Sequence, residues 1–374
     1  GLGKESCFLW GARQTGKSTL LKQLFPGAMY YDLLLSDEFE RLNRQPQTMR
    51  QEVLAAAEKQ KKKPLVVIDE VQKVPALLDE TQWLIVNHGI QFILCGSSAR
   101  KLKRAGGNLL GGRAVRFELY PFVYKEIPNF NLLKALNGGL LPRHYLSEKP
   151  RQLIQAYIGD YLQQEIAAEA LTRNIPAFGK FLESAAFSNG EIINYSNIAS
   201  ECGISAPTVK EYFQILEDTL IANLIPSYQK RPKRRVIQSP KFYFFDLGIA
   251  NFLLKRGEIR YKSELFGRVF EHFIFQELIA HSRYSGINYS ISYWRTASQM
   301  EVDFVLGDHE TIIEVKSVES ANASHCKNLR AFQEEYKVKK AVVVSLDPRP
   351  RLLDAVNILP WNIFLEDLWG GKII

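Results

Sequence analysis

The chain has few of the residues that build disulfide frameworks, zinc sites or membrane spans. Its 374 residues include four cysteines, far apart and without a Cys-x-x-Cys pair, and six histidines that form no cluster at metal-ligand spacing. This excludes a disulfide-stapled secreted domain and gives no indication of a zinc site. No apolar run approaches the roughly 18–20 residues that cross a bilayer, and no signal peptide is visible. A cytoplasmic protein with no membrane partner is therefore expected.

The charge of the chain is only mildly unbalanced. Lys and Arg number 48 and Asp and Glu number 40, so the formal net charge is +8. A basic excess of this size permits nucleic acid as a partner but does not require it. The length exceeds that of one ordinary hydrophobic core, so two or three domains are expected.

The most specific motif is a glycine-rich stretch near the N-terminus. Residues 6–25 read SCFLWGARQTGKSTLLKQLF, in which an apolar run precedes Gly-x-x-x-x-Gly-Lys-Ser and a helical pattern follows it. Strand, glycine loop and helix in this order form the P-loop, whose backbone N–H groups surround nucleotide phosphates. Lys17 is expected to reach the β- and γ-phosphates, and the Ser18 hydroxyl to bind Mg²⁺. The other nucleotide-binding residues predicted in this motif are Gly11, Arg13, Gln14, Thr15, Gly16 and Thr19.

A second apolar strand ends in two acids. Residues 65–70 read LVVIDE, and they predict that Asp69 holds the Mg²⁺-bound water while Glu70 polarises the attacking water. Strands of this kind, separated by helical stretches at 51–60 and 77–87, predict a parallel sheet. Arg113, in a later loop, is a candidate catalytic arginine that reaches a nucleotide in cis or from a neighbouring subunit. The alternative is an ordinary surface arginine.

Four stretches together resemble the successive motifs of a prokaryotic AAA-type ATPase family. They are GARQTGKSTLL, VVIDEVQKVP, ILCGSSARKL and LLGGRAVRFELYPF. Members of this family carry a C-terminal domain of unknown function, and the resemblance covers nearly the whole chain. It implies ATP rather than GTP as the nucleotide, and a γ-phosphate-sensing role for Ser97 or Ser98. Cys95 departs from the family pattern, which has a threonine before the glycine.

The middle of the chain has the pattern of a helix-turn-helix. After a helical stretch at 151–171, residues 195–225 predict two helices around a tight turn, with Ser196 and Ser205 as N-caps. The β-rich stretch that follows resembles the wing of a winged helix. The residues expected to face inward from the second helix are Val209, Tyr212, Phe213 and Leu216.

Residues 229–241 are basic and contain no acid. A basic wing beside a recognition helix is expected to bind nucleic-acid phosphates. The alternatives remain open that the loop is merely solvated or that the module binds protein, because the second helix carries acids as well as Lys210. The basic residues of the stretch are Lys230, Arg231, Lys233, Arg234, Arg235 and Lys241.

From residue 263 the expected order of elements is α-β-β-β-α-β, which fits a restriction-endonuclease-like core. Residues 300–317, MEVDFVLGDHETIIEVKS, place Asp303 before Glu314 and Lys316, as in the D…E-x-K signature of PD-(D/E)xK nucleases. Asp303, Glu314 and Glu271 of the preceding helix are predicted to bind Mg²⁺, and Lys316 to orient or activate a water. The alternative is a hairpin with charges on its solvated face.

These patterns predict an α/β protein of three domains. They are a P-loop ATPase domain with a parallel sheet (1–145), a helical linker with a winged helix (146–260) and a PD-(D/E)xK nuclease-like α/β domain (261–374). The expected function is ATP binding and hydrolysis with Mg²⁺, coupled to a DNA-associated, nuclease-like domain. The alternative is a nucleotide-dependent switch or assembly ATPase whose C-terminal domain binds a partner without cleaving. DNA is the expected partner, and the chain is a candidate homo-oligomer.

Overall fold

The computed structural model describes residues 2–60, 63–98, 100, 102, 110–159, 175–230, 234 and 236–374. They form two compact units, residues 1–120 with 218–220, and residues 121–217 with 221–374. The first unit thus ends before the boundary expected at residue 145, and the middle and C-terminal segments share one unit. Within the described ranges, no helix is long and apolar enough to cross a membrane.

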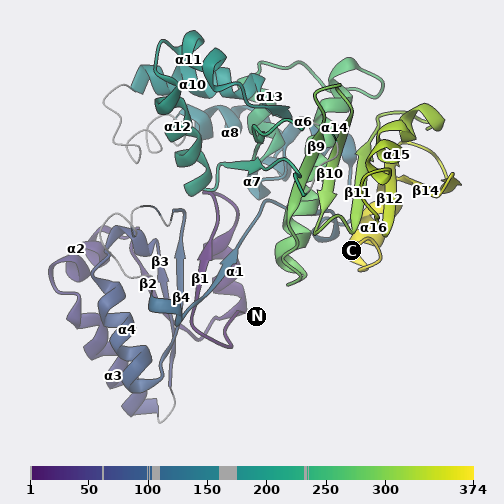
Figure 1. The fold of residues 1–374 in the computed structure, drawn as a ribbon. Helices are drawn as coiled ribbons and strands as arrows, with labels where there is room; N and C mark the ends of the chain where they lie inside the picture. Colours follow the sequence, from purple (N-terminus) through teal and green to yellow (C-terminus); the bar gives the residue numbers. More distant parts are fainter. Residues whose placement is uncertain are drawn as a thin grey trace. The chain divides into compact units, whose positions relative to one another are not determined.

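The first unit is a parallel sheet with helices on both faces (Figure 1). Its elements are β1 (Cys7–Trp10), α1 (Lys17–Leu24), β2 (Met29–Asp32), α2 (Ser36–Arg44), α3 (Gln47–Gln60), β3 (Leu65–Asp69), α4 (Leu77–His88), β4 (Gln91–Gly96) and β5 (Val115–Glu118). The strand order is β2-β3-β4-β1-β5. The parallel sheet predicted from the sequence is confirmed, with β4 between the strand that precedes the P-loop and the strand that ends in Asp69.

Strand β1 shows how the sheet is held between two cores. Cys7 and Leu9 pack with Leu21 of α1 on one face. Phe8 and Trp10 pack on the other face with apolar residues of α2, α3 and α4. Successive side chains of a strand point to opposite faces, so a strand buried on both sides has to be apolar throughout. This accounts for the unbroken CFLW run.

The middle of the chain folds into helices around a small antiparallel sheet of order β6-β8-β7. Its elements are α6 (Leu132–Gly138), α7 (Pro142–Tyr145), α8 (Pro150–Ala156), α10 (Ile175–Phe187), β6 (Glu191–Ile192), α11 (Tyr195–Cys202), α12 (Ala206–Asp218), β7 (Ala222–Ile225), β8 (Lys241–Phe244) and α13 (Leu247–Leu253). The helix expected at 151–171 is described only in its first part, because residues 160–174 lie outside the described ranges.

The two helices predicted at 195–218 are present as α11 and α12. The four side chains predicted to face inward from α12 are all buried. Ser205 caps α12 as expected, because its hydroxyl accepts the N–H of Thr208 at 3.2 Å. The predicted cap of α11 is wrong: Asn194, not Ser196, accepts the N–H of Asn197 at 3.1 Å. The helix begins two residues earlier than a cap at Ser196 would give.

The C-terminal part is a six-stranded mixed sheet of order β13-β14-β12-β11-β10-β9, covered by helices on both faces (Figure 1). Its elements are α14 (Glu264–Tyr284), β9 (Ile291–Arg295), β10 (Glu301–Leu306), β11 (Thr311–Val315), α15 (Lys327–Gln333), β12 (Lys340–Ser345), β13 (Arg351–Leu353), β14 (Val356–Pro360) and α16 (Trp361–Trp369). Strands β9, β10 and β11 form an antiparallel meander, and β11, β12 and β14 are parallel. The order α-β-β-β-α-β expected from residue 263 is present.

The segment that leads into β8 is hydrogen-bonded to this sheet. The N–H of Tyr228 donates to the carbonyl of Tyr293 at 2.7 Å, and the N–H of Ile237 donates to the carbonyl of Arg295 at 2.9 Å. Both carbonyls belong to β9, the edge strand. The middle of the chain therefore covers an edge that would otherwise present unpaired backbone groups.

Candidate functional site

The P-loop joins β1 to α1 at the carboxyl edge of the first sheet. Gly16 caps α1 with φ 96°, in the left-handed region that glycine adopts without steric cost. A Cβ on Gly11 would lie 2.6 Å from the backbone oxygen of Leu119, so only glycine fits there. The loop thus approaches the first turn of α1 closely, where helix N–H groups and the helix dipole attract phosphate.

Lys17 is held inside this loop. Its side chain is buried, and its Nζ donates to the backbone oxygens of Gly11 at 2.7 Å and Ala12 at 2.9 Å. Burial lowers the pKa of Lys17, because it disfavours the charged ammonium. Phosphate oxygens can replace these two carbonyls as acceptors and would form stronger, charge-assisted bonds.

Asp69 and Ser18 are linked through a residue that sequence reasoning missed. The hydroxyl of Tyr30, on β2, donates to Oδ2 of Asp69 at 2.6 Å and also interacts with the Ser18 hydroxyl. Burial and the bond to Asp69 raise the pKa of Tyr30, so its hydroxyl keeps its proton. A carboxylate and a hydroxyl around one polar atom are the oxygen ligands that Mg²⁺ prefers. The two predicted ligands therefore fit that ion.

Glu70, Gln72 and Ser97 form a second linked group at this edge. Glu70 has φ 57°, an uncommon backbone conformation for a residue other than glycine. The amide nitrogen of Gln72 donates to Glu70 Oε2 and, at 3.3 Å, to Ser97 Oγ. Gln72 is not among the site residues predicted from the sequence, although its position three residues after Asp69 indicates that it lies near the site. It connects the predicted water-polarising acid to the predicted phosphate sensor.

The structure places the predicted nucleotide-binding residues in one region. The P-loop turn and the ends of β3 and β4 lie at the same edge of the sheet, since all three strands are parallel. The residues that this brings together are Gly11, Arg13, Gln14, Thr15, Gly16, Lys17, Ser18, Thr19, Asp69, Glu70 and Ser97. Ser98, the alternative sensor, instead accepts the N–H of Arg100 through its hydroxyl at 3.2 Å.

Arg113 lies at the opposite edge of the sheet. Strand β5 is parallel to β1, with Val115 opposite Cys7 and Glu118 opposite Trp10. Arg113 precedes Val115, whereas the P-loop follows Trp10. Arg113 and the P-loop are therefore separated by the length of the strands, at about 3.3 Å per residue. A role for Arg113 in cis is therefore wrong for this topology. Its side chain is exposed, and a role at a neighbouring subunit's nucleotide stays a prediction.

The C-terminal sheet brings Asp303, Glu314 and Lys316 together. Oδ2 of Asp303 accepts the N–H of Val315 at 2.7 Å, and Lys316 Nζ lies 2.7 Å from Glu314 Oε1. Both acids are buried, and Oε2 of Glu314 has no hydrogen-bond partner. Burial, followed by the negative charge of Glu314, raises the pKa of Asp303. Two crowded carboxylates with one unpaired oxygen indicate a place where a cation would be stabilised.

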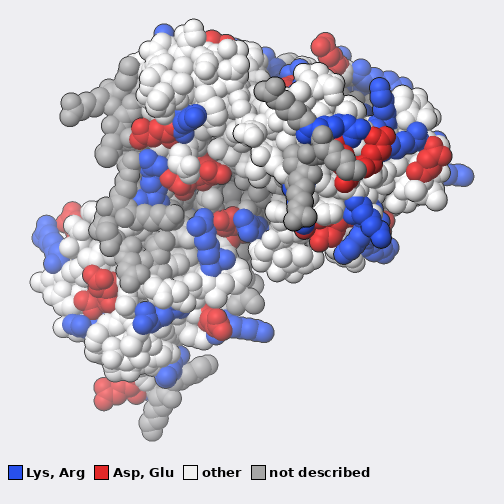
Figure 2. Space-filling view, in the orientation of Figure 1, with Lys and Arg blue, Asp and Glu red and all other residues white. Residues whose placement is uncertain are grey.

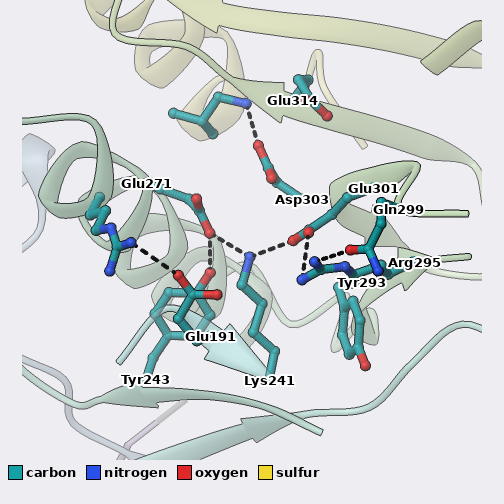
Figure 3. Close-up of polar contacts among 12 residues, drawn as sticks. Glu191, Lys241, Tyr243, Glu271, Tyr293, Arg295, Gln299, Glu301, Asp303 and Glu314 are labelled. Carbon is teal, nitrogen blue, oxygen red and sulfur yellow. Dashed lines mark hydrogen bonds and ion pairs between the residues drawn. The ribbon is translucent and has the colours of Figure 1, made fainter. Parts of the chain in front are cut away.

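Glu271 points to a different cation, Lys241 of β8 (Figure 3). The Lys241 side chain is 3% exposed, and its Nζ lies 2.7 Å from Glu271 Oε1 and 3.1 Å from Glu301 Oε1. Glu271 also accepts the hydroxyl of Tyr243. Burial alone would lower the pKa of Lys241, but the Glu271 charge opposes this and the pKa is raised. Lys241 is thus a buried, charged and hydrogen-bonded member of this cluster.

The predicted three-carboxylate metal site is not formed. In the part of the chain that the structure describes, no three His, Cys, Asp or Glu side chains are arranged to hold one metal ion. Glu271 is instead paired with Lys241. Asp303 and Glu314 are what remains of the expected ligand set, and their hard oxygen atoms fit Mg²⁺.

The basic stretch at 229–241 is not a free cationic surface where it is described. Lys230 pairs with Asp308, and Arg234 pairs with Glu334 and, at 2.6 Å, with Glu335. Lys241 is buried against carboxylates, as described above. Figure 2 likewise shows basic and acidic side chains intermixed on the face drawn. The remaining basic residues of the stretch, Arg231, Lys233 and Arg235, lie outside the described residues.

The sequence contained a signal for Lys241 that was misread. This lysine opens the run KFYFFD, in which every following residue up to Asp246 is apolar or aromatic. A lone cation at the start of a strand buried on both faces requires a buried partner. It was grouped instead with the neighbouring basic residues. Its partners, Glu271 and Glu301, are 30 and 60 residues away in sequence.

Comparison with known proteins supports a nucleotide-binding site at the P-loop. Residues 3–128 match the AAA domain family. The matched segment contains the P-loop, Asp69, Glu70 and Ser97, which lie at the carboxyl ends of parallel strands. Residues 130–260 and 266–364 match two families described only as domains of unknown function (DUF8612 and DUF4143).

The matches to two curated relatives extend beyond residues 3–128, but both relatives are themselves uncharacterised. Protein MJ1544 of Methanocaldococcus jannaschii is 24% identical over 400 residues, which covers 95% of this chain and 87% of that protein. Protein Rv2008c of Mycobacterium tuberculosis is 22% identical over 307 residues, 79% of this chain and 68% of that protein.

Solved structures give only distant likenesses. The ADP form of the Aeropyrum pernix ORC2 protein has a TM-score of 0.29 at 13% identity, covering 59% of this chain and 81% of that chain. The STAND protein PH0952 of Pyrococcus horikoshii, which has a tetratricopeptide repeat sensor, has a TM-score of 0.22 at 13% identity, covering 75% and 47%. Both scores are too low to bear on the fold or the function of this chain.

Proposed function

We propose that the protein binds ATP with Mg²⁺ and hydrolyses it at the AAA domain. The observation that carries this proposal is the meeting of the P-loop and Asp69–Glu70 at one sheet edge, with Ser97 beside them on the intervening strand. A phosphate chain held by the loop and α1 would lie between Lys17 and Glu70. The assignment of ATP rather than GTP rests on the match to the AAA family.

Each group has a role that its position allows. Ser18 and Asp69 would hold Mg²⁺, which when bound neutralises charge on the phosphate oxygens. Lys17 would exchange its two backbone acceptors for phosphate oxygens. Glu70 would accept a hydrogen bond from the attacking water, and Gln72 would fix the direction of its carboxylate. Positioning and charge stabilisation supply most of the catalysis in phosphoryl transfer.

The test is ATP turnover in matched variants of the full chain. Lys17→Ala should lose both nucleotide binding and turnover, whereas Glu70→Gln should keep binding and lose turnover by about 10²–10⁴-fold. Gln23→Ala is the control for Lys17→Ala, because Gln23 lies on the same helix and is exposed. Undiminished turnover in both Lys17→Ala and Glu70→Gln would contradict the proposed site.

A second proposed function concerns the remaining part of the chain, as a DNA-associated module with a nuclease-like centre. The order α10–β6–α11–α12–β7–β8 supports a winged helix, and the element order from α14 supports a PD-(D/E)xK-like fold. The observations in favour of a centre are the proximity of Asp303, Glu314 and Lys316 and the lack of a partner for Glu314 Oε2. Asp303 and Glu314 would hold Mg²⁺, and Lys316 would orient a water.

The competing proposal is a nucleotide-dependent switch whose C-terminal part binds a partner without cleaving it. The internal pairing of Lys230, Arg234 and Lys241 favours it, because these cations are not free for DNA phosphates. Plasmid and linear DNA incubated with Mg²⁺ or Mn²⁺, with and without ATP, distinguish the two. Cutting that Asp303→Asn abolishes and the exposed control Asp354→Asn preserves supports the nuclease. Absence of cutting under every condition supports the switch.

A further inference from the structure

We propose that the ammonium of Lys241 is a built-in cation of the C-terminal carboxylate cluster, which takes the place of a divalent ion at Glu271 and Glu301. The cluster is the set Glu271, Glu301, Asp303 and Glu314, with Lys241 and Lys316. The inference refines the second proposed function, because it states which of these acids are available to a metal.

Lys241 is buried to a degree that a lysine reaches only when carboxylates neutralise its charge. Its side chain is 3% exposed and lies 5.8 Å above the ring of Tyr243. Fully buried lysines are rare unless they are paired, because removing an ammonium from water is costly. Here two carboxylates, Glu271 and Glu301, surround its Nζ at 2.7 and 3.1 Å. These contacts make Lys241 a structural ion rather than a surface charge.

The carboxylates around Lys241 come from elements that converge on one point. Glu271 lies on α14, while Glu301 and Asp303 lie two residues apart on β10 (Figure 3). Lys241 comes from β8 of the other sheet and reaches the cluster from the opposite side. A divalent ion that used Glu271 would have to share this space with the ammonium, and like charges at that separation repel strongly.

Both oxygens of Glu301 and Oε1 of Glu271 already have cationic or hydrogen-bonding partners. Glu271 Oε1 accepts from both Lys241 and the Tyr243 hydroxyl, and Arg295 lies 3.3 Å from Oε2 of Glu301. Asp303 and Glu314 differ, because in the described structure neither contacts Lys241 within ion-pair distance and Glu314 Oε2 has no partner. The cluster is thus divided into a half that surrounds Lys241 and a half in which Lys316 pairs with Oε1 of Glu314 while Oε2 has no partner.

The experiment counts bound Mn²⁺ by electron paramagnetic resonance in the full chain without nucleotide. All proteins carry Asp69→Asn, so that an ion at the P-loop is not counted. Lys241→Met should bind one Mn²⁺ more than this parent, because Glu271 and Glu301 are left without their cation. Lys241→Arg, which keeps the charge, is the matched control and should add none. Adding Glu271→Gln to Lys241→Met should remove the extra ion.

Two results would overturn the inference. One is a folded Lys241→Met protein that binds no additional Mn²⁺. The other is a parent protein whose own Mn²⁺ ion is lost on Glu271→Gln, since Glu271 would then be a ligand beside an intact lysine. If Lys241→Met does not fold, the comparison of the parent with and without Glu271→Gln decides alone. A Mn²⁺ count of the parent that Glu271→Gln leaves unchanged then supports the inference. The measurement does not depend on DNA cleavage. Failure of the nuclease proposal can therefore be distinguished from failure of this inference.

Discussion

The hydroxyl of Tyr30 lies 2.6 Å from Oδ2 of Asp69, on the neighbouring strand of the same parallel sheet. Because the hydroxyl also interacts with Ser18, it occupies the space between the two residues predicted to hold Mg²⁺. Binding of the metal–nucleotide complex is therefore expected to displace it.

Tyr30→Phe is expected to have two effects. It should lower the free energy of unfolding of the nucleotide-free protein by about 2 kcal/mol, which is typical for a hydrogen bond to a charged group. It should also increase the stabilisation gained on adding MgADP, because no hydroxyl has to be displaced. Thermal unfolding with and without MgADP measures both effects.

The control for Tyr30 is its neighbour in sequence. The Tyr31 hydroxyl donates to Glu52 at 3.0 Å, away from the P-loop. Tyr31→Phe should lower stability without changing the response to MgADP. A smaller MgADP response in Tyr30→Phe than in the unsubstituted chain would show that Tyr30 supports metal binding instead of competing with it.

Gln72→Met should reduce ATP turnover with little change in nucleotide affinity. Its amide holds Glu70 toward Ser97, and a misplaced catalytic group can cost about 10²-fold in rate. Steady-state kinetics that separate kcat from KM provide the measurement. Gln91→Met, at the other end of β4, serves as control because Gln91 donates only to the backbone oxygen of Lys4. A rise in kcat would mean that Gln72 restrains Glu70 rather than aligning it.

A matched pair of substitutions tests the start of α11. Asn194→Ala should lower the free energy of unfolding by about 1 kcal/mol, because the cap to Asn197 is lost. Ser196→Ala should change it by less than about 0.5 kcal/mol, because Ser196 is exposed and lies inside the helix. Chemical denaturation of the two variants gives the comparison. Equal losses would restore Ser196 as the cap.

Glu277 should make stability depend on pH. This buried carboxylate accepts the N–H of Tyr124 at 2.7 Å and the indole N–H of Trp369 at 2.8 Å, and burial raises its pKa to about 7. The folded state therefore binds the proton more tightly than the unfolded chain, whose pKa is near 4.5. Stability should fall as pH rises from about 4.5 to about 7, by about 3 kcal/mol, and level off above that.

Glu277→Gln isolates this contribution from other titrating groups. The difference in unfolding free energy between the unsubstituted chain and Glu277→Gln, measured at pH 5 and pH 8, should shift in favour of the variant at the higher pH. A difference that is the same at both values would show that Glu277 does not titrate between them.

Local sequence patterns predicted the elements whose physics is local. The P-loop glycines, the acids that end β3 and the apolar period of α12 each depend on neighbours within a few residues. These patterns correctly indicated a parallel sheet and the helix pair α11–α12. The N-cap of α11 was misplaced by two residues, since both Asn194 and Ser196 are chemically suited to the position.

The rest of the site depends on strand order, which no local pattern contains. Its position in a glycine-containing loop made Arg113 a candidate for reaching a nucleotide. Because β5 is parallel to β1 and Arg113 precedes β5, Arg113 lies at the sheet edge opposite the P-loop. Tyr30 reaches Asp69 across 39 residues, and Lys241 reaches Glu301 across 60. Each of these contacts joins strands or sheets whose adjacency is decided by the packing of the whole unit.

The pairing of residues 228 and 237 with β9 has a consequence for how the protein can be divided. A fragment of residues 261–374 would lose the chain that covers its edge strand, and would leave Glu271 and Glu301 without Lys241. An uncovered edge invites pairing with other molecules, and half-buried acids without a counter-ion destabilise the fold. Residues 261–374 are therefore expected to aggregate when expressed alone, and to remain monodisperse when the chain begins at residue 121.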